Sequence, residues 1–240
     1  MLEAVLFDWG DTLMQFAYSP ELVAAGHRAG LAAIGRDGLP AEDALTERFR
    51  EHYEPLFWAP GTIEEIEYPQ LVRRLLGDFG FEVDDDELGR FLEAEHRAWD
   101  PARILAAHTH PLLEALRARG LRLGLVSNAF DPGWLLHRDL DQMGLAQRLD
   151  FSVFSSEVGK RKPHPAIFEH ALAVLGVEPT RALFVGDRLY EDVRGAAEVG
   201  MATVQALWFR VDEHPEGAEP DHRAFTQLDV LNVVRRLTAG

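Results

Sequence analysis

The chain has 240 residues, no cysteine and a formal net charge of −16 at pH 7. This length suits one substantial hydrophobic core, or a core with a smaller second domain. The acidic charge argues against a nucleic-acid partner, because duplex binding depends on basic patches. No apolar stretch approaches the ~20 residues that span a membrane, and the N-terminus lacks the features of a signal peptide. A cytoplasmic protein with no membrane partner is expected.

The first predicted element is a strand over Ala4–Phe7, an unbroken apolar run. Such a run is typical of a strand that is buried on both faces of a parallel sheet. Asp8 follows at once, and Gly10 comes two residues later. The strand therefore delivers a carboxylate to the carboxyl edge of a sheet, which is where open α/β sheets bind ligands.

Residues 13–20 are expected to form a loop or hairpin that leads away from the sheet. From Glu21 to about Trp99 the apolar residues recur at three- and four-residue steps, which predicts helices and no strand. Asp84 to Asp86 are placed where negative charge stabilises the N-terminus of the last of these helices. The four helical segments have their apolar faces within Leu22–Ile34, Ala44–Tyr53, Leu71–Phe79 and Leu88–Glu95. A helical insertion of this length would lie over the sheet edge as a lid.

From Pro111 the pattern alternates between helix and strand, which predicts a parallel, doubly wound sheet. The predicted strands are Leu121–Val126, Phe151–Phe154, Ala182–Val185 and, as the last one, Ala202–Leu207. The predicted helices run from Pro111 to about Gly120 and over Trp134–Met143, Pro165–Leu175, Asp192–Val199 and Leu228–Leu237. Thr226 and Asp229 give the last helix a start that resembles a capping box. Residues 212–221 predict a plain solvated loop.

Polar side chains follow four of the predicted strands. They are Asp8, Ser127, a lysine (Lys160 or Lys162) beyond the third, and Asp187 with Asp192 five residues on. Because the carboxyl ends of parallel strands meet at one edge of a sheet, these groups are expected to converge. The two lysines are the only ones among 24 basic residues, which favours a task that arginine fills less well.

These four points resemble the motifs of the haloacid dehalogenase-like (HAD) hydrolases, and the resemblance covers nearly the whole chain. The first motif of that family, DxDx(T/V) after an apolar strand, is matched in part by DWGDT at residues 8–12. The second is matched by Ser127 in LGLVSN and the third by Lys162 in GKRKPHPAIF. The fourth, GDxxxxD, is matched by GDRLYED at residues 186–192.

The resemblance implies an α/β fold, a Rossmann-like doubly wound core with an all-helical cap inserted between the first two motifs. The core would comprise residues 1–15 and 104–240, and the cap residues 16–103. The resemblance also implies a Mg²⁺-dependent phosphatase. Its substrate would be a small phosphorylated metabolite, hydrolysed through an aspartyl-phosphate on Asp8.

The residue roles follow from the same resemblance. Asp8 would attack phosphorus with Lys162 as a cation beside it, and catalysis would consist mainly of positioning and electrostatic stabilisation. The ligands of Mg²⁺, which prefers hard oxygen atoms, would be Asp8, Asp187, Asp192 and the backbone carbonyl of Gly10. Contacts to the substrate would come from Trp9, Gly10, Ser127 and Asn128.

The first motif departs from the family pattern at one position. In the family, a second aspartate that acts as general acid and base stands two residues after the nucleophile. In this chain that position is Gly10, and an aspartate, Asp11, comes one residue later. A one-residue step in an extended segment turns a side chain to the opposite face. Asp11 then takes no part, unless the loop bends at the permissive Gly10 and brings it back. Without such a group the rate falls ~10²–10⁴-fold, which predicts a slow enzyme or one limited to good leaving groups.

Two other functions remain open. A HAD-like protein that binds metal and phosphate without turnover would act as a regulator, and the altered first motif favours it. A metal-independent haloacid dehalogenase also lacks the second aspartate, but it does not need both Asp187 and Asp192. A phosphonoacetaldehyde hydrolase is excluded, because it needs a lysine in the lid and residues 21–99 contain none.

The lid is expected to shape the leaving-group pocket, although no motif specifies the substrate or the oligomeric state. The candidate pocket residues are Phe16, Tyr18, Tyr53, Phe57, Trp58, Tyr68 and Trp99, with His52 or His96. Packing inside the lid is the competing interpretation for each of them. His108 and His110 are expected at the surface or at a helix start, away from any metal.

Overall fold

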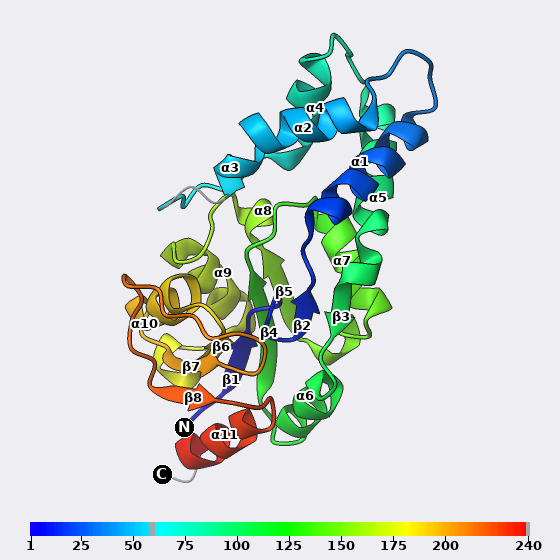
Figure 1. The fold of residues 1–240 in the computed structure, drawn as a ribbon. Helices are drawn as coiled ribbons and strands as arrows, with labels where there is room; N and C mark the ends of the chain where they lie inside the picture. The colour runs from blue at the N-terminus through cyan, green and yellow to red at the C-terminus, as the bar shows by residue number, and fades with distance from the viewer. Residues whose placement is uncertain (58–60, 239–240) are drawn as a thin grey trace.

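Figure 1 shows the fold in a computed structural model, which describes residues 1–57 and 61–238. One part of the molecule is a β-sheet with helices on both faces. The other part is a bundle of helices that lies beyond one end of the sheet. Among the described residues, no helix has both the length and the apolar character needed to cross a bilayer.

The sheet has six strands, all parallel, in the order β5-β4-β1-β6-β7-β8. The first strand of the chain lies inside the sheet, paired with β4 on one side and β6 on the other. The strands are β1 (Ala4–Phe7), β4 (Arg122–Ser127), β5 (Phe151–Phe154), β6 (Ala182–Gly186), β7 (Ala202–Ala206) and β8 (His222–Ala224). The predicted α/β fold with a parallel sheet is confirmed.

Helices cover both faces of this sheet. On one face lie α6 (Thr109–Arg117), α7 (Gly133–Gln142) and α11 (Asp229–Thr238), and on the other α9 (Pro165–Leu175) and α10 (Gly195–Glu198). A short helix, α8 (Ser155–Val158), follows β5. The predicted cap of the last helix is present, since Thr226 N donates to Asp229 Oδ2 at 2.8 Å and Asp229 N donates to Thr226 Oγ1 at 3.3 Å.

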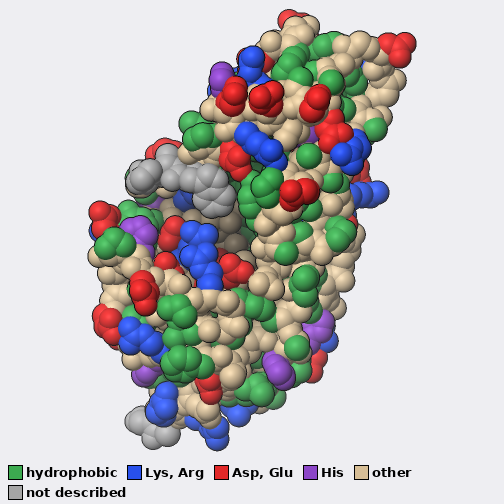
Figure 2. Space-filling view, in the orientation of Figure 1, with side chains coloured by type: hydrophobic (Ala, Val, Ile, Leu, Met, Phe, Trp, Pro, Cys, Tyr) green, Lys and Arg blue, Asp and Glu red, His purple; other side chains and the backbone are tan. Residues whose placement is uncertain are grey.

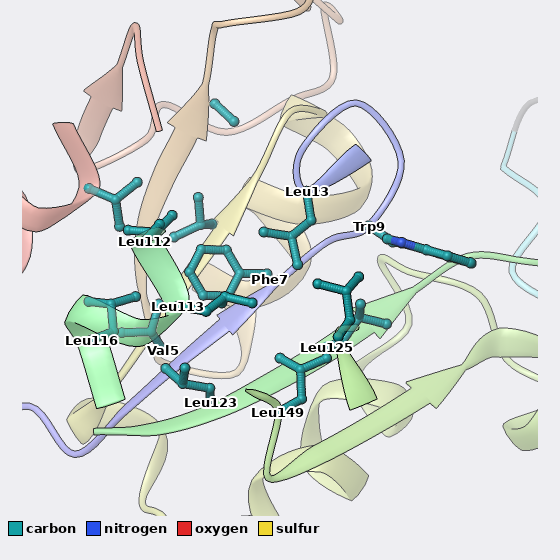
Figure 3. Packing of buried hydrophobic residues seen from close by; sticks show 14 of the residues in the cluster. Val5, Phe7, Trp9, Leu13, Leu112, Leu113, Leu116, Leu123, Leu125 and Leu149 are labelled. Carbon is teal, nitrogen blue, oxygen red and sulfur yellow. The ribbon is translucent and has the colours of Figure 1, made fainter. Parts of the chain in front are cut away.

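Successive side chains of β1 point to opposite faces of the sheet, and both faces are covered, so the strand is buried on both sides. Ala4 and Leu6 pack into the cluster that includes α9, whereas Val5 and Phe7 pack into the cluster that includes α6, α7 and α11. All four side chains are fully buried. Figure 3 shows the second cluster, in which Trp9 lies at the carboxyl end of β1. Residues that follow β1 therefore emerge at the end of the sheet that faces the helical bundle.

The helical bundle consists of α1 (Pro20–Ile34), α2 (Glu42–His52), α3 (Glu54–Phe57), α4 (Tyr68–Gly77) and α5 (Asp85–Ala98). Its apolar faces enclose a core of their own, which includes Leu45, Leu71 and Phe91. A capping box starts α5, in which Glu87 N donates to Asp84 Oδ1 at 2.8 Å. The antiparallel strands β2 (Met14–Phe16) and β3 (Arg103–Leu105) pair where the chain enters and leaves the bundle.

The structure corrects several of the sequence predictions. Residues 202–207 were predicted to form the last strand, but β8 follows them. The sequence did not predict β3 either. Three residues are too few to show an alternation. The segment at residues 13–20 pairs with β3 instead of forming a local hairpin. The helix predicted over residues 192–199 is a π-helical turn, η4 (Leu189–Arg194), followed by α10.

The loop at residues 212–221 is also more than the plain solvated loop that its composition predicts. Leu189 N donates to Asp212 Oδ2 at 2.7 Å, and Gln205 Nε2 donates to the Asp212 carbonyl at 2.9 Å. A Cβ on Gly217 would collide with Leu189, so glycine permits the close approach of the loop. The loop is thereby tied to the π-helical turn.

Glu95 of α5 is buried inside the helical bundle, where Tyr68 donates to its Oε2 at 2.8 Å. Its Oε1 has no hydrogen-bond partner among the described residues, and His27 Nε2 lies 3.6 Å away. Burial raises the pKa of Glu95 to about 8, which outweighs the opposite effect of the Tyr68 hydrogen bond. The carboxyl group is therefore mostly protonated at pH 7 in the folded protein.

We expect Glu95→Gln to stabilise the protein increasingly as the pH rises. The unfolded carboxyl ionises near its ordinary pKa of 4.5, whereas the folded one does so near 8. The stability contributed by the neutral form is thus complete below pH 4.5 and is lost as the pH rises to about 8. Glutamine cannot ionise, so the difference in Tm should grow by up to ~4 °C per pH unit between pH 5 and pH 8. A constant difference in Tm would contradict a neutral Glu95.

Candidate active site

A cavity of about 890 Å³ lies between the carboxyl edge of the sheet and the helical bundle. Figure 2 shows it as a hollow, with acidic and basic side chains gathered on the side of the sheet. Mostly apolar side chains of the bundle line the other side. Eight of the predicted site residues line this cavity: Asp8, Trp9, Gly10, Asp11, Ser127, Asn128, Lys162 and Asp192.

Three predicted carboxylates meet at the sheet end of the cavity, two of which, Asp8 and Asp192, line it. Asp8 follows β1, Asp187 follows β6, and Asp192 lies in the π-helical turn. One oxygen of each lies within 4.8 Å of the others, and all three side chains are buried. Gly186 permits this approach, because a Cβ there would collide with the carboxyl group of Asp192. The fold therefore brings together the side chains expected to share a metal ion.

Lys162 lies among these carboxylates with 2% of its surface exposed. Its Nζ donates to Asp8 Oδ1 at 2.6 Å, to Asp192 Oδ1 at 2.6 Å and to the Val126 carbonyl at 2.9 Å. Burial lowers the pKa of Lys162, but the two carboxylates outweigh burial, so the pKa is raised above its ordinary value. Of the two candidate lysines, Lys162 is the one that enters the site. Lys160 pairs with Glu64 of the bundle segment.

The three carboxylates lie close enough to repel one another. Burial raises the pKa of Asp8 to about 6 despite the Lys162 ammonium. Burial and the two neighbouring carboxylates raise the pKa of Asp187 well above its ordinary value. Asp187 Oδ2 has no hydrogen-bond partner among the described residues, since Arg210 Nε lies 3.1 Å from it but outside hydrogen-bonding geometry. A divalent cation fits this donor set, because it would offset the repulsion between the carboxylates and bind the unpartnered oxygen.

Asn128 holds Lys162 in place through the backbone. Its Oδ1 accepts from Lys162 N at 2.7 Å, and its Nδ2 donates to the Lys162 carbonyl at 3.1 Å. Both ends of the amide are engaged, so the structure gives Asn128 a positioning contact in addition to its place in the cavity wall. Ser127, one residue earlier, ends β4 and lines the cavity with 4% of its surface exposed.

The loop after β1 turns Asp11 into the same cavity as Asp8. Asp11 has a left-handed backbone conformation with φ 53°, and Leu13 N and Met14 N both donate to the Trp9 carbonyl, so the chain turns over Gly10 and Asp11. The one-residue step therefore does not turn the Asp11 side chain away from the site. Its Oδ2 lies 3.8 Å from Arg210 Nη1. A Cβ built on Gly10 meets no atom within 4 Å, which leaves room for a side chain at that position.

Two arginines near the carboxylates were not predicted from the sequence. Arg188 follows Asp187 directly, and Arg210 lies in the loop after β7. Both line the cavity. The sequence did contain a signal for the two arginines, because each of them follows a predicted strand by a few residues. No motif marks these positions, however, and arginine is the commonest basic residue throughout this chain.

The predicted lid residues divide into pocket and packing residues. Those that line the cavity are Phe16, Tyr18, Phe57, Tyr68 and Trp99. Tyr53 is not among them, and its hydroxyl donates to Asp78 at 3.0 Å. Trp58 lies outside the described residues, and His52 is exposed. His108 immediately precedes α6 and His110 lies in its first turn, as predicted.

His96 joins the bundle to the sheet part and does not line the pocket. It is fully buried, with Nε2 2.8 Å from Asp139 Oδ2 of α7 and Nδ1 3.1 Å from Asp131 Oδ1 of the loop after β4. Burial lowers the pKa of His96, but the hydrogen bonds to the two aspartates outweigh it and raise the pKa. This contact fixes the position of α5 against the loop that follows Ser127.

A second contact between the two parts lies over the segment that carries Lys162. Arg161 Nη1 donates to Glu65 Oε1 at 3.0 Å, and Glu65 N donates to the Gly159 carbonyl at 3.1 Å. The Glu65 side chain is 3% exposed. The bundle is thus held on the sheet part on both sides of the cavity.

Comparisons with known proteins identify the family. Residues 2–200 match the model of the haloacid dehalogenase-like hydrolases. The chain is 31% identical over 241 residues to the glyceraldehyde 3-phosphate phosphatase of Methanopyrus kandleri, across 99% of both chains. It is 40% identical over 113 residues to the phosphoserine phosphatase of Thermus thermophilus, across 46% of this chain and 43% of that one.

The fold is similar to that of the 2-haloacid dehalogenase from Pseudomonas syringae pv. Tomato. The TM-score is 0.72 over 99% of this chain and 100% of that one, and the sequences are 24% identical. This likeness concerns the fold alone. The family model covers most of the chain and contains all four motifs, and the chain belongs to the haloacid dehalogenase-like hydrolases.

Proposed function

We propose that this hydrolase is a Mg²⁺-dependent phosphatase that acts on a small phosphate monoester through an aspartyl-phosphate on Asp8. The observation that carries the proposal is the meeting of Asp8, Asp187 and Asp192 at the sheet end of the cavity, where Lys162 Nζ donates to Asp8 and to Asp192. The relatives named glyceraldehyde 3-phosphate phosphatase and phosphoserine phosphatase support the same class of substrate, a small phosphorylated metabolite.

In the proposed reaction, a carboxylate oxygen of Asp8 attacks phosphorus while the bond from phosphorus to the ester oxygen breaks. The departing oxygen takes up a proton and leaves as an alcohol. Water then attacks the acyl phosphate, which releases inorganic phosphate and regenerates Asp8. Both transition states spread negative charge over the phosphoryl oxygens, so donors and cations that are already in place lower their energy.

The surrounding groups would supply those donors and cations. Lys162 would stabilise the charge on the phosphoryl group and orient Asp8, to which it already donates at 2.6 Å. Ser127 would donate its hydroxyl to a phosphoryl oxygen, and the backbone N–H of Trp9 would donate to another. Mg²⁺ held by Asp8, Asp187, Asp192 and the Gly10 carbonyl would offset the repulsion between the carboxylate and the phosphate.

We also propose that residues 16–103 act as a cap on a core of residues 1–15 and 104–240. The pairing of β2 with β3 keeps the two connections side by side. His96 and Glu65 anchor the bundle at separate places on the sheet part. A cap in this position would exclude water during the attack on phosphorus and would have to open for the products to leave.

Asp11 is the proposed proton-transfer group in place of an aspartate at position 10. We expect Asp11→Asn to lower kcat/KM by ~10²-fold on alkyl phosphates, whose leaving oxygen needs a proton, and by much less on 4-nitrophenyl phosphate. Gly10→Asp should restore activity to this variant, because a side chain at position 10 meets no atom within 4 Å of its Cβ. Equal losses on both classes of ester, or no restoration by Gly10→Asp, would contradict this role of Asp11.

Phosphate release tests the proposed function. A screen over sugar, nucleotide and acyl phosphates should show release in the presence of Mg²⁺, none in EDTA, and none with Asp8→Asn. A protein that binds Mg²⁺ but hydrolyses none of these esters would instead be a regulatory binding protein, which the altered first motif favours. Halide release from a 2-haloacid in EDTA would identify a dehalogenase, for which the paired Asp187 and Asp192 would have no use.

A further inference from the structure

The half of the cavity that lies away from the carboxylates has an aromatic wall. We use this term for Phe49, Phe57, Tyr68 and Trp99 of the bundle together with Phe130 of the sheet part, all of which line the cavity. Phe130 is in contact with three of the others, with ring centroids 4.6 Å from Phe57, 4.8 Å from Tyr68 and 6.4 Å from Trp99. It stands three residues after Ser127, the proposed phosphate donor. The wall thus begins close to where the phosphoryl group would bind.

The polar atoms of the aromatic wall are turned into the protein. The Tyr68 hydroxyl donates to the buried Glu95 at 2.8 Å, and Trp99 Nε1 donates to the Leu22 carbonyl at 3.1 Å. Both donors are therefore engaged before any substrate binds. The phenylalanine rings have no polar atoms to offer. A hydroxyl group of a substrate in this half of the cavity would lose its water without gaining a partner from the wall, which is unfavourable.

The charged side chains next to the aromatic wall are paired as well. Arg103 is 5% exposed and its Nε lies 3.2 Å from Asp139 Oδ2, while Arg161 Nη1 lies 3.0 Å from Glu65 Oε1. Asp131 is paired with the buried His96. These groups neutralise one another within the protein. A carboxylate or second phosphate on the leaving group would have to displace an existing partner to gain a contact here.

We propose that the leaving group is apolar, so that the substrates are phosphate monoesters of aromatic or branched aliphatic alcohols. The inference rests on the proposed phosphatase function and names the substrate class of that same site. Apolar surface gains most where it replaces water against carbon atoms. A three-carbon phosphate ester would leave most of a cavity of about 890 Å³ filled with water. This chain thus prefers a bulkier and less polar ester than the glyceraldehyde 3-phosphate for which its relative is named.

Three esters of primary alcohols test the inference, because their leaving groups are similar in chemistry and differ in size and polarity. We expect kcat/KM with Mg²⁺ to be ~100-fold higher for 2-phenylethyl phosphate than for ethyl phosphate or glycerol 3-phosphate. If kcat/KM for glycerol 3-phosphate equalled or exceeded that for 2-phenylethyl phosphate, the inference would be overturned, but the proposed phosphatase function would still hold. No phosphate from any ester, including those of the wider screen, would overturn both.

A matched pair of variants separates recognition from folding. Phe57 and Phe79 both lie partly buried against the core of the bundle, but only Phe57 lines the cavity. Phe57→Ala should lower kcat/KM for 2-phenylethyl phosphate ~10-fold and change that for ethyl phosphate less than ~2-fold. Phe79→Ala should change kcat/KM for neither ester, although it should lower the Tm at least as much as Phe57→Ala does. Equal losses on both esters with Phe57→Ala would show that the ring serves the fold and would overturn the inference.

Discussion

Asp8→Asn is expected to abolish phosphate release, with kcat at least ~10⁴-fold lower than in the wild type. An amide does not attack phosphorus, so the variant cannot form the acyl phosphate. The shape of the site should survive, because asparagine retains an oxygen that can accept from Lys162 Nζ, which now lies 2.6 Å from Asp8 Oδ1. The measurement is steady-state phosphate release from 4-nitrophenyl phosphate with Mg²⁺.

Asp11→Asn is the matched control for this variant, since it removes a carboxylate from the same loop and the same cavity. It should retain most of its kcat/KM on 4-nitrophenyl phosphate, and the Tm of both variants should stay within a few degrees of the wild type. If Asp8→Asn kept more than one-hundredth of the wild-type kcat, a group other than Asp8 would have to attack phosphorus.

Lys162→Met is expected to lower both the activity and the stability of the protein. Methionine fills a similar volume without a charge, and it would leave Asp8 and Asp192 buried without their shared cation. Removing one partner of a buried ion pair costs ~3–5 kcal/mol of the free energy of unfolding. Loss of one stabilising donor at the transition state lowers kcat by ~10²–10³-fold. Urea unfolding in EDTA and phosphate release with Mg²⁺ measure the two effects separately.

The chain offers Lys160→Met as the control, because Lys160 and Lys162 are its only lysines. Lys160 pairs with Glu64 at the surface, where the side chains are 33% and 67% exposed. An exposed pair of this kind contributes ~0–1 kcal/mol, so this variant should behave like the wild type in both assays. Equal effects of the two substitutions would mean that the buried contacts of Lys162 do not account for its role.

The sequence alone located the strands that carry the site, because each of them is an apolar run that ends at a polar residue. Ala4–Phe7 is the clearest example, and Asp8 stands where that run predicts. The three-residue strands β3 and β8 were out of reach, since their pairing partners are distant in the chain and their own residues show no period. Propensity likewise does not distinguish an α-helix from the π-helical turn at Leu189–Arg194, which places Asp192 beside Asp187.

Individual side-chain contacts depend on tertiary structure and were harder to predict. The family resemblance implies a substrate contact for Asn128, and its amide also spans the backbone of Lys162, 34 residues away, which the sequence did not predict. His96 is a candidate pocket residue by its place in the lid, yet it is fully buried between two aspartates of the sheet part. In both cases the partner comes from a distant segment, and periodicity within one segment carries no information about it.

The central claim is that Asp8 carries the phosphoryl group during turnover, and acid-quench trapping tests it most directly. Enzyme mixed with a radiolabelled aryl phosphate and Mg²⁺ should yield label on the peptide that contains Asp8. The label should be released by hydroxylamine, as an acyl phosphate is, and should be absent in EDTA and in Asp8→Asn. Phosphate release by an enzyme that shows no label on Asp8 at any quench time would contradict the account.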